Sequence, residues 1–371
     1  MKFTCERDKI LSAFQTAATV APSRSPKAIL QNVKLVVTEQ AATLLATDME
    51  VGIRIEVPGI QVESTGEALL PVTRFGSMLR ESTDARLLVE AIPQGTLVRG
   101  DRSEFKFQAG NPAEFPQIAT FSDEHHHEVT GRLLKELIRR TLFATDTESS
   151  RYALGGVLLE FEPDKVIAVG TDGRRLAKME GPAQRVGDHE TRDTTTIVPA
   201  RSMQLIERAF SDLESPVQIA ARTNDILLRN PRTTVYSRLV EGRFPKWRDV
   251  FPARRDAVQI SLAVGPLYAA LRQAAVVSSD ESRGIDFSFG DGTLVLTGAT
   301  AEVGQTRVEF PIVYDGPTLR LSLDHRYVAD FLKVLDPEKM IVFDLESPDS
   351  AALLTTDDGY GYVVMPLARD R

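Results

Sequence analysis

The sequence is poor in the features that disulfides, cysteine-based metal sites and membrane spans require. A single cysteine, Cys5, excludes an internal disulfide and leaves too few thiolates for such a zinc site, so we expect a cytosolic protein. No run of about eighteen apolar residues occurs, and no membrane-spanning helix is expected. The charged N-terminal stretch MKFTCERDKILSAF has no uninterrupted apolar core and does not resemble a secretory signal.

Motifs of common enzyme classes are also missing. The sequence contains neither the phosphate loop of P-loop NTPases nor GxGxxG, so no nucleotide cofactor is expected. His189 and His325 are isolated, which gives a Ser–His–Asp arrangement no positional support. Acidic pairs such as Asp48 with Glu50 arise by chance among 52 acidic residues, so none is singled out as a general acid or base.

Three consecutive histidines, His125, His126 and His127, form the one cluster of metal-ligand type. Adjacent residues rarely direct their side chains at one ion, and no cysteine lies nearby. We therefore expect a solvated linker here and predict no metal site.

The composition is that of an ordinary globular protein, with 42% hydrophobic and 26% charged residues. Its 371 residues suffice for two or three domains. The net charge of −8 argues against a uniformly basic nucleic-acid coat but leaves a local basic surface open.

The chain repeats a pattern three times, with starts near Ile10, Leu133 and Pro266. Each copy has apolar residues at helical spacing, then small and polar residues, an arginine (Arg24, Arg151 and Arg283) and an alternating strand. A second pattern of strand, helix and strand begins near Ala68, Thr196 and Leu319. In its helices, Phe75, Met78 and Leu79, and likewise Met203, Leu205 and Ile206, form an apolar stripe.

These repeats predict an α+β protein of three tandem similar domains, each made of two halves with a helix on antiparallel strands. Six helices and about two dozen strands are expected. Polar stretches at 121–129 and 251–260, which lack strand alternation, are the predicted joints, giving domains over residues 1–124, 129–253 and 256–371.

Basic residues gather on the predicted helices, whereas strands and turns hold much of the acid. This distribution is typical of charged surface helices in general, but it also fits helices that together face a polyanion. Phosphate contacts of that kind are independent of sequence and weaken steeply with salt. The candidates for such contacts are Arg74, Arg80, Lys135, Arg139, Arg140, Arg201 and Arg283.

The stretch GTDGRRLA, residues 170–177, invites two interpretations. Its glycines and arginines could cradle a phosphate, or Asp172-Gly173 could form a two-residue hairpin turn between alternating strands. The first repeat has a Thr-Asp pair at the corresponding place, Thr47-Asp48, which favours a turn.

The three bipartite repeats, TDGRRLA, GRFPKW at 242–247 and the C-terminal YVVMPL together resemble the bacterial DNA sliding clamps, the beta subunits of DNA polymerase III. The resemblance covers essentially the whole chain. It implies a head-to-tail homodimer whose six domains close a ring, with helices lining the hole and sheets outside. Such a ring tethers the replicative polymerase to duplex DNA and has no catalytic step. Candidate interface residues lie around 74–108 and 270–310.

The resemblance also implies a pocket, between the second and third domains, for a short linear motif of the polymerase alpha subunit, the clamp loader, and other polymerases and repair proteins. The matching residues are Leu154, Thr171, Gly173, Arg175, Leu176, Pro245, Val250, Val363, Met365, Pro366 and Leu367. Apolar side chains suit anchoring, and methionine adapts to several partners. The stretch 170–177 is then a turn that walls this groove.

For DNA contact the resemblance implies Arg24 and the loop with Arg151 and Tyr152. Here Ala153 replaces a second aromatic residue found in some relatives. Asp249 stands where the family often has arginine, and the tail runs past Leu367 by ARDR, so the partner motif is left open.

Two alternative functions differ from the clamp in what they predict. A phosphate-binding enzyme using the 170–177 turn would show turnover that depends on Arg175. A DNA-binding protein that grips one site would hold circular and linear DNA equally.

Overall fold

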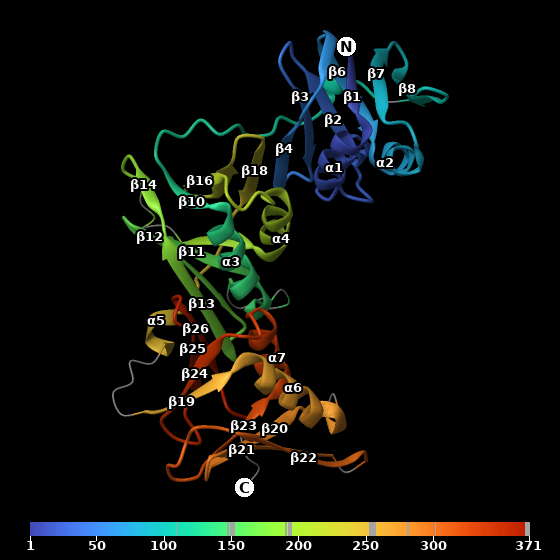
Figure 1. Cartoon of the computed structure of the whole chain (residues 1–371). Helices are drawn as coiled ribbons and strands as arrows, with labels where there is room; N and C mark the ends of the chain where they lie inside the picture. Colours follow the sequence, from blue (N-terminus) through green and yellow to red (C-terminus); the bar gives the residue numbers. More distant parts are fainter. Residues whose placement is uncertain are drawn as a thin grey trace. The chain divides into compact units, whose positions relative to one another are not determined.

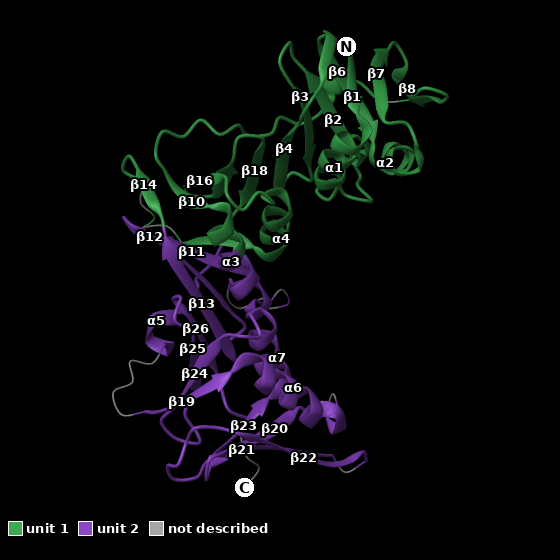
Figure 2. Cartoon of the chain, in the orientation of Figure 1, with its two compact units in different colours: residues 1–135, 183–239 green, residues 136–182, 240–371 purple. Residues whose placement is uncertain are grey.

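The computed structural model of the protein consists of antiparallel sheets with helices packed on them (Figure 1), as the α+β prediction requires. The residues described are 1–108, 110–146, 148, 153–189, 191, 195–251, 257–279, 282–300 and 302–367. Two compact units make up the chain (Figure 2). The first unit contains residues 1–135 and 183–239, and the second contains 136–182 and 240–371.

The first unit contains a five-stranded sheet in the order β5-β1-β7-β8-β9 and a nine-stranded sheet in the order β14-β10-β16-β17-β18-β4-β3-β2-β6. Its strands are β1 (Lys2–Glu6), β2 (Asn32–Val37), β3 (Ala42–Thr47), β4 (Val51–Val57), β5 (Gln61–Ser64), β6 (Gly66–Pro71), β7 (Arg86–Ile92), β8 (Gly95–Arg99), β9 (Glu104–Gln108), β10 (His126–Thr130), β14 (Gln184–Val186), β15 (Thr196–Pro199), β16 (Pro216–Ala221), β17 (Asp225–Arg229) and β18 (Thr233–Arg238). Its helices are α1 (Arg7–Ala18), α2 (Val72–Glu81) and α4 (Ala200–Ala209), with short 3-10 turns at Ala28–Gln31 and Pro112–Glu114.

In the second unit, seven strands of an eight-stranded sheet follow the order β11-β12-β13-β26-β25-β24-β19, and a four-stranded sheet runs β22-β21-β20-β23. The strands are β11 (Gly156–Phe161), β12 (Lys165–Thr171), β13 (Arg175–Pro182), β19 (Val258–Ala263), β20 (Gly284–Gly290), β21 (Thr293–Thr300), β22 (Gly304–Pro311), β23 (Leu319–Asp324), β24 (Met340–Leu345), β25 (Ala352–Thr355) and β26 (Tyr360–Val364). The helices are α5 (Trp247–Val250), α6 (Val264–Ala274) and α7 (His325–Lys333), with 3-10 turns at Leu142–Ala144 and Ala275–Val277, and α3 (Gly131–Thr141) crosses the boundary between the units.

Six helices of nine residues or more occur in the described residues, as predicted, and only the four-residue α5 is additional. The predicted apolar stripes of α2 and α4 are buried. In the first repeat, for example, the Phe14 ring of α1 lies 4.9 Å from the Phe75 ring of α2. Burial of these stripes, more than helix propensity, holds such short helices in place.

The sheets continue across the predicted joints. Strand β18 pairs with β4, so that Thr233 faces Ile55 and Ser237 faces Val51, although these strands belong to different predicted domains. In the second unit β26 pairs with β13 in the same way. The sequence repeats did not show this, and the boundaries at 124/129 and 253/256 stay a prediction.

The connection between the first two predicted domains packs on the nine-stranded sheet. Phe115 and Ile118 join a cluster with Leu45 and Leu69. A Cβ atom on Gly52 of β4 would lie only 2.7 Å from Ile118 Cγ2. Glycine at this position therefore leaves room for the Ile118 side chain where the connection crosses β4.

The prediction of a solvated histidine linker is wrong for two of its three residues. His126 and His127 belong to β10 and are buried. His127 Nδ1 lies 2.6 Å from Nδ1 of His189, and burial lowers the pKa of His189 to about 4. These histidines therefore serve the core, and the described residues contain no group of three or more His, Cys, Asp or Glu side chains able to hold a metal ion.

The prediction that Arg140 contacts DNA is wrong, because its side chain is buried and not available to DNA. Its Nε lies 2.7 Å from Glu136 Oε2, its Nη1 lies 2.9 Å from Asp358 Oδ2, and its guanidinium stacks over the Tyr360 ring. Lys339 Nζ also donates to Asp358, at 3.0 Å. The cluster ties α3 to the hairpin of β25 and β26.

Replacing Asp358 by Asn should lower stability at neutral pH. Burial opposes the charge of this carboxylate, but hydrogen bonds from Thr356, Arg140 and Lys339 outweigh it and lower its pKa to about 2. Because the folded-state pKa is depressed, the carboxylate stabilises the fold above its unfolded pKa, and this contribution is lost as pH falls from about 4 towards 2. D358N should cost about 1–3 kcal/mol at pH 7, since Arg140 then keeps only one carboxylate.

Thermal melting of wild type and D358N at pH 7 and pH 3 measures this contribution. The difference should be large at pH 7 and smaller at pH 3. The control is D357N, because Asp357 is 90% exposed and 3.9 Å from Lys339. Equal melting of D358N and wild type at pH 7 would contradict the assigned role.

Candidate functional site

The stretch 170–177 forms a wider loop than the sequence indicated. Thr171 of β12 and Leu176 of β13 form the last pair of this hairpin, so four residues, 172–175, lie between them instead of the predicted two. The last of them, Arg175, already belongs to β13 and pairs with Val364 of β26. Thr171 Oγ1 donates to the backbone oxygen of Arg175 at 2.6 Å and accepts from Gly173 N at 3.1 Å. The φ of Gly173 is +85°, a conformation that favours glycine, and no atom lies within 4 Å of a Cβ placed there.

Asp172 closes the same loop through its side chain. Its Oδ1 accepts from the backbone nitrogens of Arg174 and Arg175 at 2.9 and 3.0 Å. Such a side-chain cap replaces strand hydrogen bonds that the loop cannot make. The loop is therefore held by its own Thr-Asp pair and needs no bound anion.

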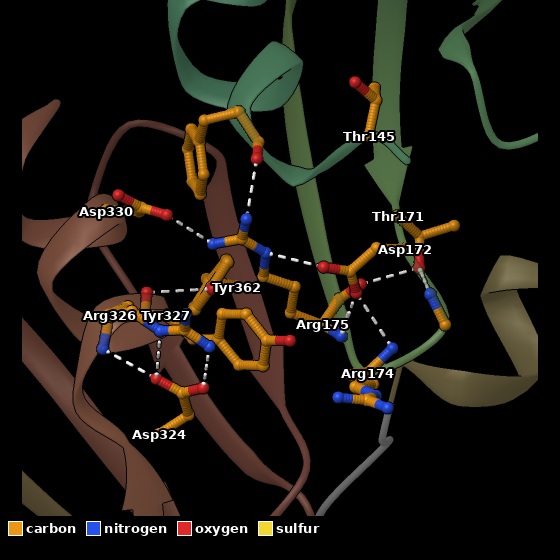
Figure 3. A network of polar contacts seen from close by, with 12 residues as sticks. Thr145, Thr171, Asp172, Arg174, Arg175, Asp324, Arg326, Tyr327, Asp330 and Tyr362 are labelled. Carbon is orange, nitrogen blue, oxygen red and sulfur yellow. Dashed lines mark hydrogen bonds and ion pairs between the residues drawn. The ribbon is translucent and has the colours of Figure 1, made fainter. Parts of the chain in front are cut away.

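Arg175 does not offer its guanidinium to a ligand (Figure 3). The side chain is 10% exposed, with Nε 3.0 Å from Asp172 Oδ2 and Nη1 2.7 Å from Asp330 Oδ2 of α7. Nη2 donates to the backbone oxygen of Phe143 at 2.8 Å, and the guanidinium lies 4.4 Å from the Tyr327 ring centre. This geometry excludes a phosphate cradle built on Arg175.

The electrostatics agree with this arrangement. Burial disfavours the charge of Arg175, but the Tyr362 hydroxyl and the carboxylates Asp330 and Asp172 outweigh burial and raise its pKa above the usual value. Arg175 is thus a permanent cation that joins the loop to α7 and positions the residues around it.

The C-terminal strand runs beside this loop. In the pairing of β13 with β26, Leu176 faces Val363. Beyond the strand, Met365 N donates to Arg174 O at 3.0 Å, and Leu367 N donates to Ser322 O of β23 at 2.8 Å. Residues 365–367 are therefore held by main-chain hydrogen bonds to the loop and to β23.

Three of the predicted pocket residues expose apolar side chains. Met365 is 45% exposed and Leu367 is 39% exposed, and Val250 at the end of α5 is 47% exposed. The next residue, Phe251, packs on β26, because a Cβ on Gly361 would lie 2.3 Å from its Cζ. We call the loop 172–175 with these exposed residues the apolar groove, after the peptide groove that the family resemblance implies.

The other predicted pocket residues differ in burial. Leu154, Leu176 and Val363 are buried beneath the surface. Pro245 and Pro366 are half-buried. Close to Leu154, a Cβ on Gly242 would lie 3.2 Å from Ala153 Cβ, so the segment before Pro245 passes beside residues 153–154. The residues that sequence reasoning missed are Asp330, Tyr327 and Phe143, whose contact with Arg175 arises only in three dimensions.

The residues predicted to contact DNA are mostly exposed. Arg24, Arg74, Arg80, Lys135, Arg139 and Arg201 are exposed, whereas Arg283 is half-buried. Arg201 Nη1 lies 2.8 Å from Asp48 Oδ2, so part of its charge is compensated within the protein. Arg151 and Tyr152 lie outside the described residues.

The first unit contains a second copy of the loop. Thr47 Oγ1 donates to Val51 O at 2.8 Å, and Asp48 Oδ1 accepts from the backbone nitrogens of Glu50 and Val51. Met49 takes the position of Gly173 with a φ of 84°, which explains why the missing glycine does not prevent the turn. The Thr-Asp pair was the sequence signal for both copies.

Asp172→Ala should open the loop locally without unfolding the protein. Loss of the side-chain acceptor leaves the amides of Arg174 and Arg175 without their hydrogen bonds, so their hydrogen exchange should accelerate by about ten-fold. Hydrogen exchange followed by mass spectrometry over residues 170–178 measures this effect. D48A is the matched control and should accelerate only residues 48–52; identical protection in D172A and wild type would contradict the capping role.

Family models match the chain in three consecutive parts. They are described as the N-terminal, central and C-terminal domains of the DNA polymerase III beta subunit, and they match residues 1–119, 128–246 and 248–368.

Relatives and solved structures match over their full length. The beta sliding clamp of Pseudomonas putida is 30% identical over 374 residues, covering 99% of this chain and 100% of the relative, and that of Escherichia coli is 27% identical over 370 residues with the same coverage. The solved DNA polymerase III subunit beta of Pseudomonas aeruginosa is 28% identical with a TM-score of 0.90, and a sliding clamp of that organism bound to griselimycin is 27% identical with 0.91. Both structures cover 100% of this chain and are themselves covered completely.

Proposed function

Because the chain belongs to the DNA polymerase III beta subunits, the beta sliding clamps, we propose that it encircles duplex DNA and tethers the replicative polymerase to it. The protein is a sliding clamp of DNA replication. The observation that carries the proposal is agreement with a solved clamp over 100% of both chains at a TM-score of 0.90. The protein then acts as a processivity factor in the cytoplasm, associated with the nucleoid, and catalyses no reaction itself. No helix in the described part of the chain is long and apolar enough to cross a membrane.

Ring closure needs a head-to-tail contact between two copies. Strands β9 and β22 each end their sheet and leave one edge without a strand partner among the described residues. Such edges invite pairing with another chain. Phe105 and Phe107 of β9 line a cleft of about 540 Å³ with Met78 of α2. The proposed contact joins this region of one copy to the region of β22 in the other, and a suitable rotation closes such a heterologous contact into a ring.

DNA contact in this proposal is weak and independent of sequence. Exposed arginines and lysines on α2, α3 and α4 reach phosphates, and such contacts carry no sequence information. A closed ring stays on DNA through topology, so a protein with a net charge of −8 needs only local positive charge facing the helix.

The apolar groove is the proposed docking site for short linear motifs of the polymerase alpha subunit, the clamp loader, and other polymerases and repair proteins. Its exposed Met365, Leu367 and Val250 offer apolar surface for anchoring side chains. The braced loop 172–175 makes one wall rigid before binding, which reduces the entropy lost on association.

Retention on DNA tests encirclement. Clamp loaded by a clamp loader onto a nicked circular plasmid should stay bound through gel filtration in high salt, and should be released when a restriction enzyme linearises the plasmid. Protein bound through phosphate contacts alone would leave both forms in high salt. Equal retention on circular and linear DNA would overturn the ring.

Truncation of the groove tests partner docking. Met365→Ala and Leu367→Ala should each weaken binding of a polymerase-derived motif peptide by roughly 1–4 kcal/mol, because each removes an anchor contact. Isothermal titration calorimetry measures this change, and light scattering checks that the dimer persists. Met340→Ala is the control, because Met340 is 53% exposed on β24 and lies outside the groove. Unchanged peptide affinity in both groove variants would place the docking site elsewhere.

A further inference from the structure

A cleft of about 410 Å³ lies on the nine-stranded sheet of the first unit, separate from the apolar groove. Strands β3, β4, β16, β17 and β18 contribute to it together with the turn between β17 and β18. The cleft is lined by Thr43, Arg54, Glu56, Pro216, Gln218, Arg229, Asn230, Pro231, Arg232, Thr233 and Thr234. Three arginines thus meet one glutamate in a protein whose net charge is −8.

Arg54 is the least exposed of the three arginines that line the cleft. It is half-buried on β4, and its side chain forms no ion pair or hydrogen bond with a described residue. Burial lowers its pKa, and the charge of Glu56 compensates only in part. A half-buried guanidinium whose charge is compensated only in part gains more from an incoming anion than an exposed one does.

Arg229 is held in place by neutral partners. Its Nε and Nη2 donate to Gln218 Oε1 at 3.0 and 2.6 Å, and its guanidinium lies 4.7 Å from the centre of the Phe121 ring. These contacts fix the side chain without cancelling its charge. A fixed cation binds an anion with a smaller entropy loss than a mobile one.

Register places the two arginines on one row of the sheet. Arg229 faces Thr234 on β18, and Thr234 faces Arg54 on β4. The Cα atoms of Arg229 and Arg54 are therefore two strand spacings apart, about 10 Å. Long side chains from these positions can approach one ligand from both sides, with the Thr234 hydroxyl between them.

Arg232 completes the cleft from the turn between β17 and β18. Asn230 Oδ1 accepts from Arg232 N at 3.0 Å and from Thr233 N at 2.7 Å, which fixes this turn. The side chain of Arg232 is exposed and forms no ion pair with a described residue. Three arginines, threonine hydroxyls and side-chain amides thus line one cleft.

The lining favours a small anion over a peptide. A peptide site needs apolar anchors, such as those of the apolar groove, but none of the large exposed hydrophobic side chains lines this cleft. The many donors suit the oxygens of phosphate groups. We propose that the cleft binds a small anion with two or more linked phosphate groups, of which inorganic pyrophosphate is the simplest.

Isothermal titration calorimetry of the full-length protein with inorganic pyrophosphate tests this site, in magnesium-free buffer at constant ionic strength. Wild type should bind saturably with one site per chain, and orthophosphate should bind more weakly. Arg54→Gln and Arg229→Gln should each reduce affinity by about ten-fold or more, because each removes charge-assisted hydrogen bonds. Arg86→Gln should leave binding unchanged, since Arg86 is an exposed arginine on β7 outside the cleft.

Glu56→Gln separates loss of binding from loss of folding. The variant removes the one carboxylate of the cleft and should bind pyrophosphate several-fold more tightly, which a misfolded protein cannot do. Absence of saturable binding to wild type, or equal loss in R86Q and R54Q, would overturn the proposal. Tighter binding of a hexaglutamate peptide than of pyrophosphate would also overturn it, in favour of an acidic protein segment. Plasmid retention and motif-peptide binding are independent of these outcomes.

Discussion

The antiparallel pairing of strands from different repeats is the constraint on which this structure depends. A half-domain sheet with an open edge exposes unpaired backbone donors and acceptors. Pairing of β4 with β18 and of β13 with β26 satisfies those edges within the chain. The sheets therefore extend across the joints, and β4 and β13, which pair with strands of another repeat, each follow a hairpin loop that begins with a Thr-Asp pair.

The two copies of this loop share one backbone conformation but have different side chains around them. At the first copy, Arg238 ends the paired strand β18 and lies 3.6 Å from Glu50, so charged side chains lie at the loop. At the second copy, Met365 follows the paired strand and is 45% exposed. The two loops share their main-chain geometry because strand pairing dictates it. The side chains at the end of the paired strand differ, and they determine which partner chemistry each surface suits.

Burial decides whether a basic side chain of this protein faces solvent or forms ion pairs inside the fold. Arg139 and Arg140 are neighbours on α3, but consecutive helical residues point about 100° apart. Arg139 is exposed to solvent, whereas Arg140 is buried against Glu136 and Asp358. Arg175 braces a loop and Arg54 faces a cleft, so the net charge of the chain describes none of these sites.

The sequence by itself determined the α+β class, the six long helices with their apolar stripes, and the presence of a turn after Thr171. These features depend on local periodicity and on side chains that bond to their own backbone, which neighbouring residues carry in full. The exposed residues of the apolar groove could be named from the family resemblance, although not from their spacing.

Only the tertiary structure decided which strands lie side by side, because an alternating pattern shows that a strand has one buried face but not which strand pairs with its edge. For the same reason it decided that His127 is buried beside His189, that Arg175 meets Asp330 across 155 residues, and that Arg54 and Arg229 share a row. Contacts between residues far apart in the chain follow from packing, and no local pattern encodes them.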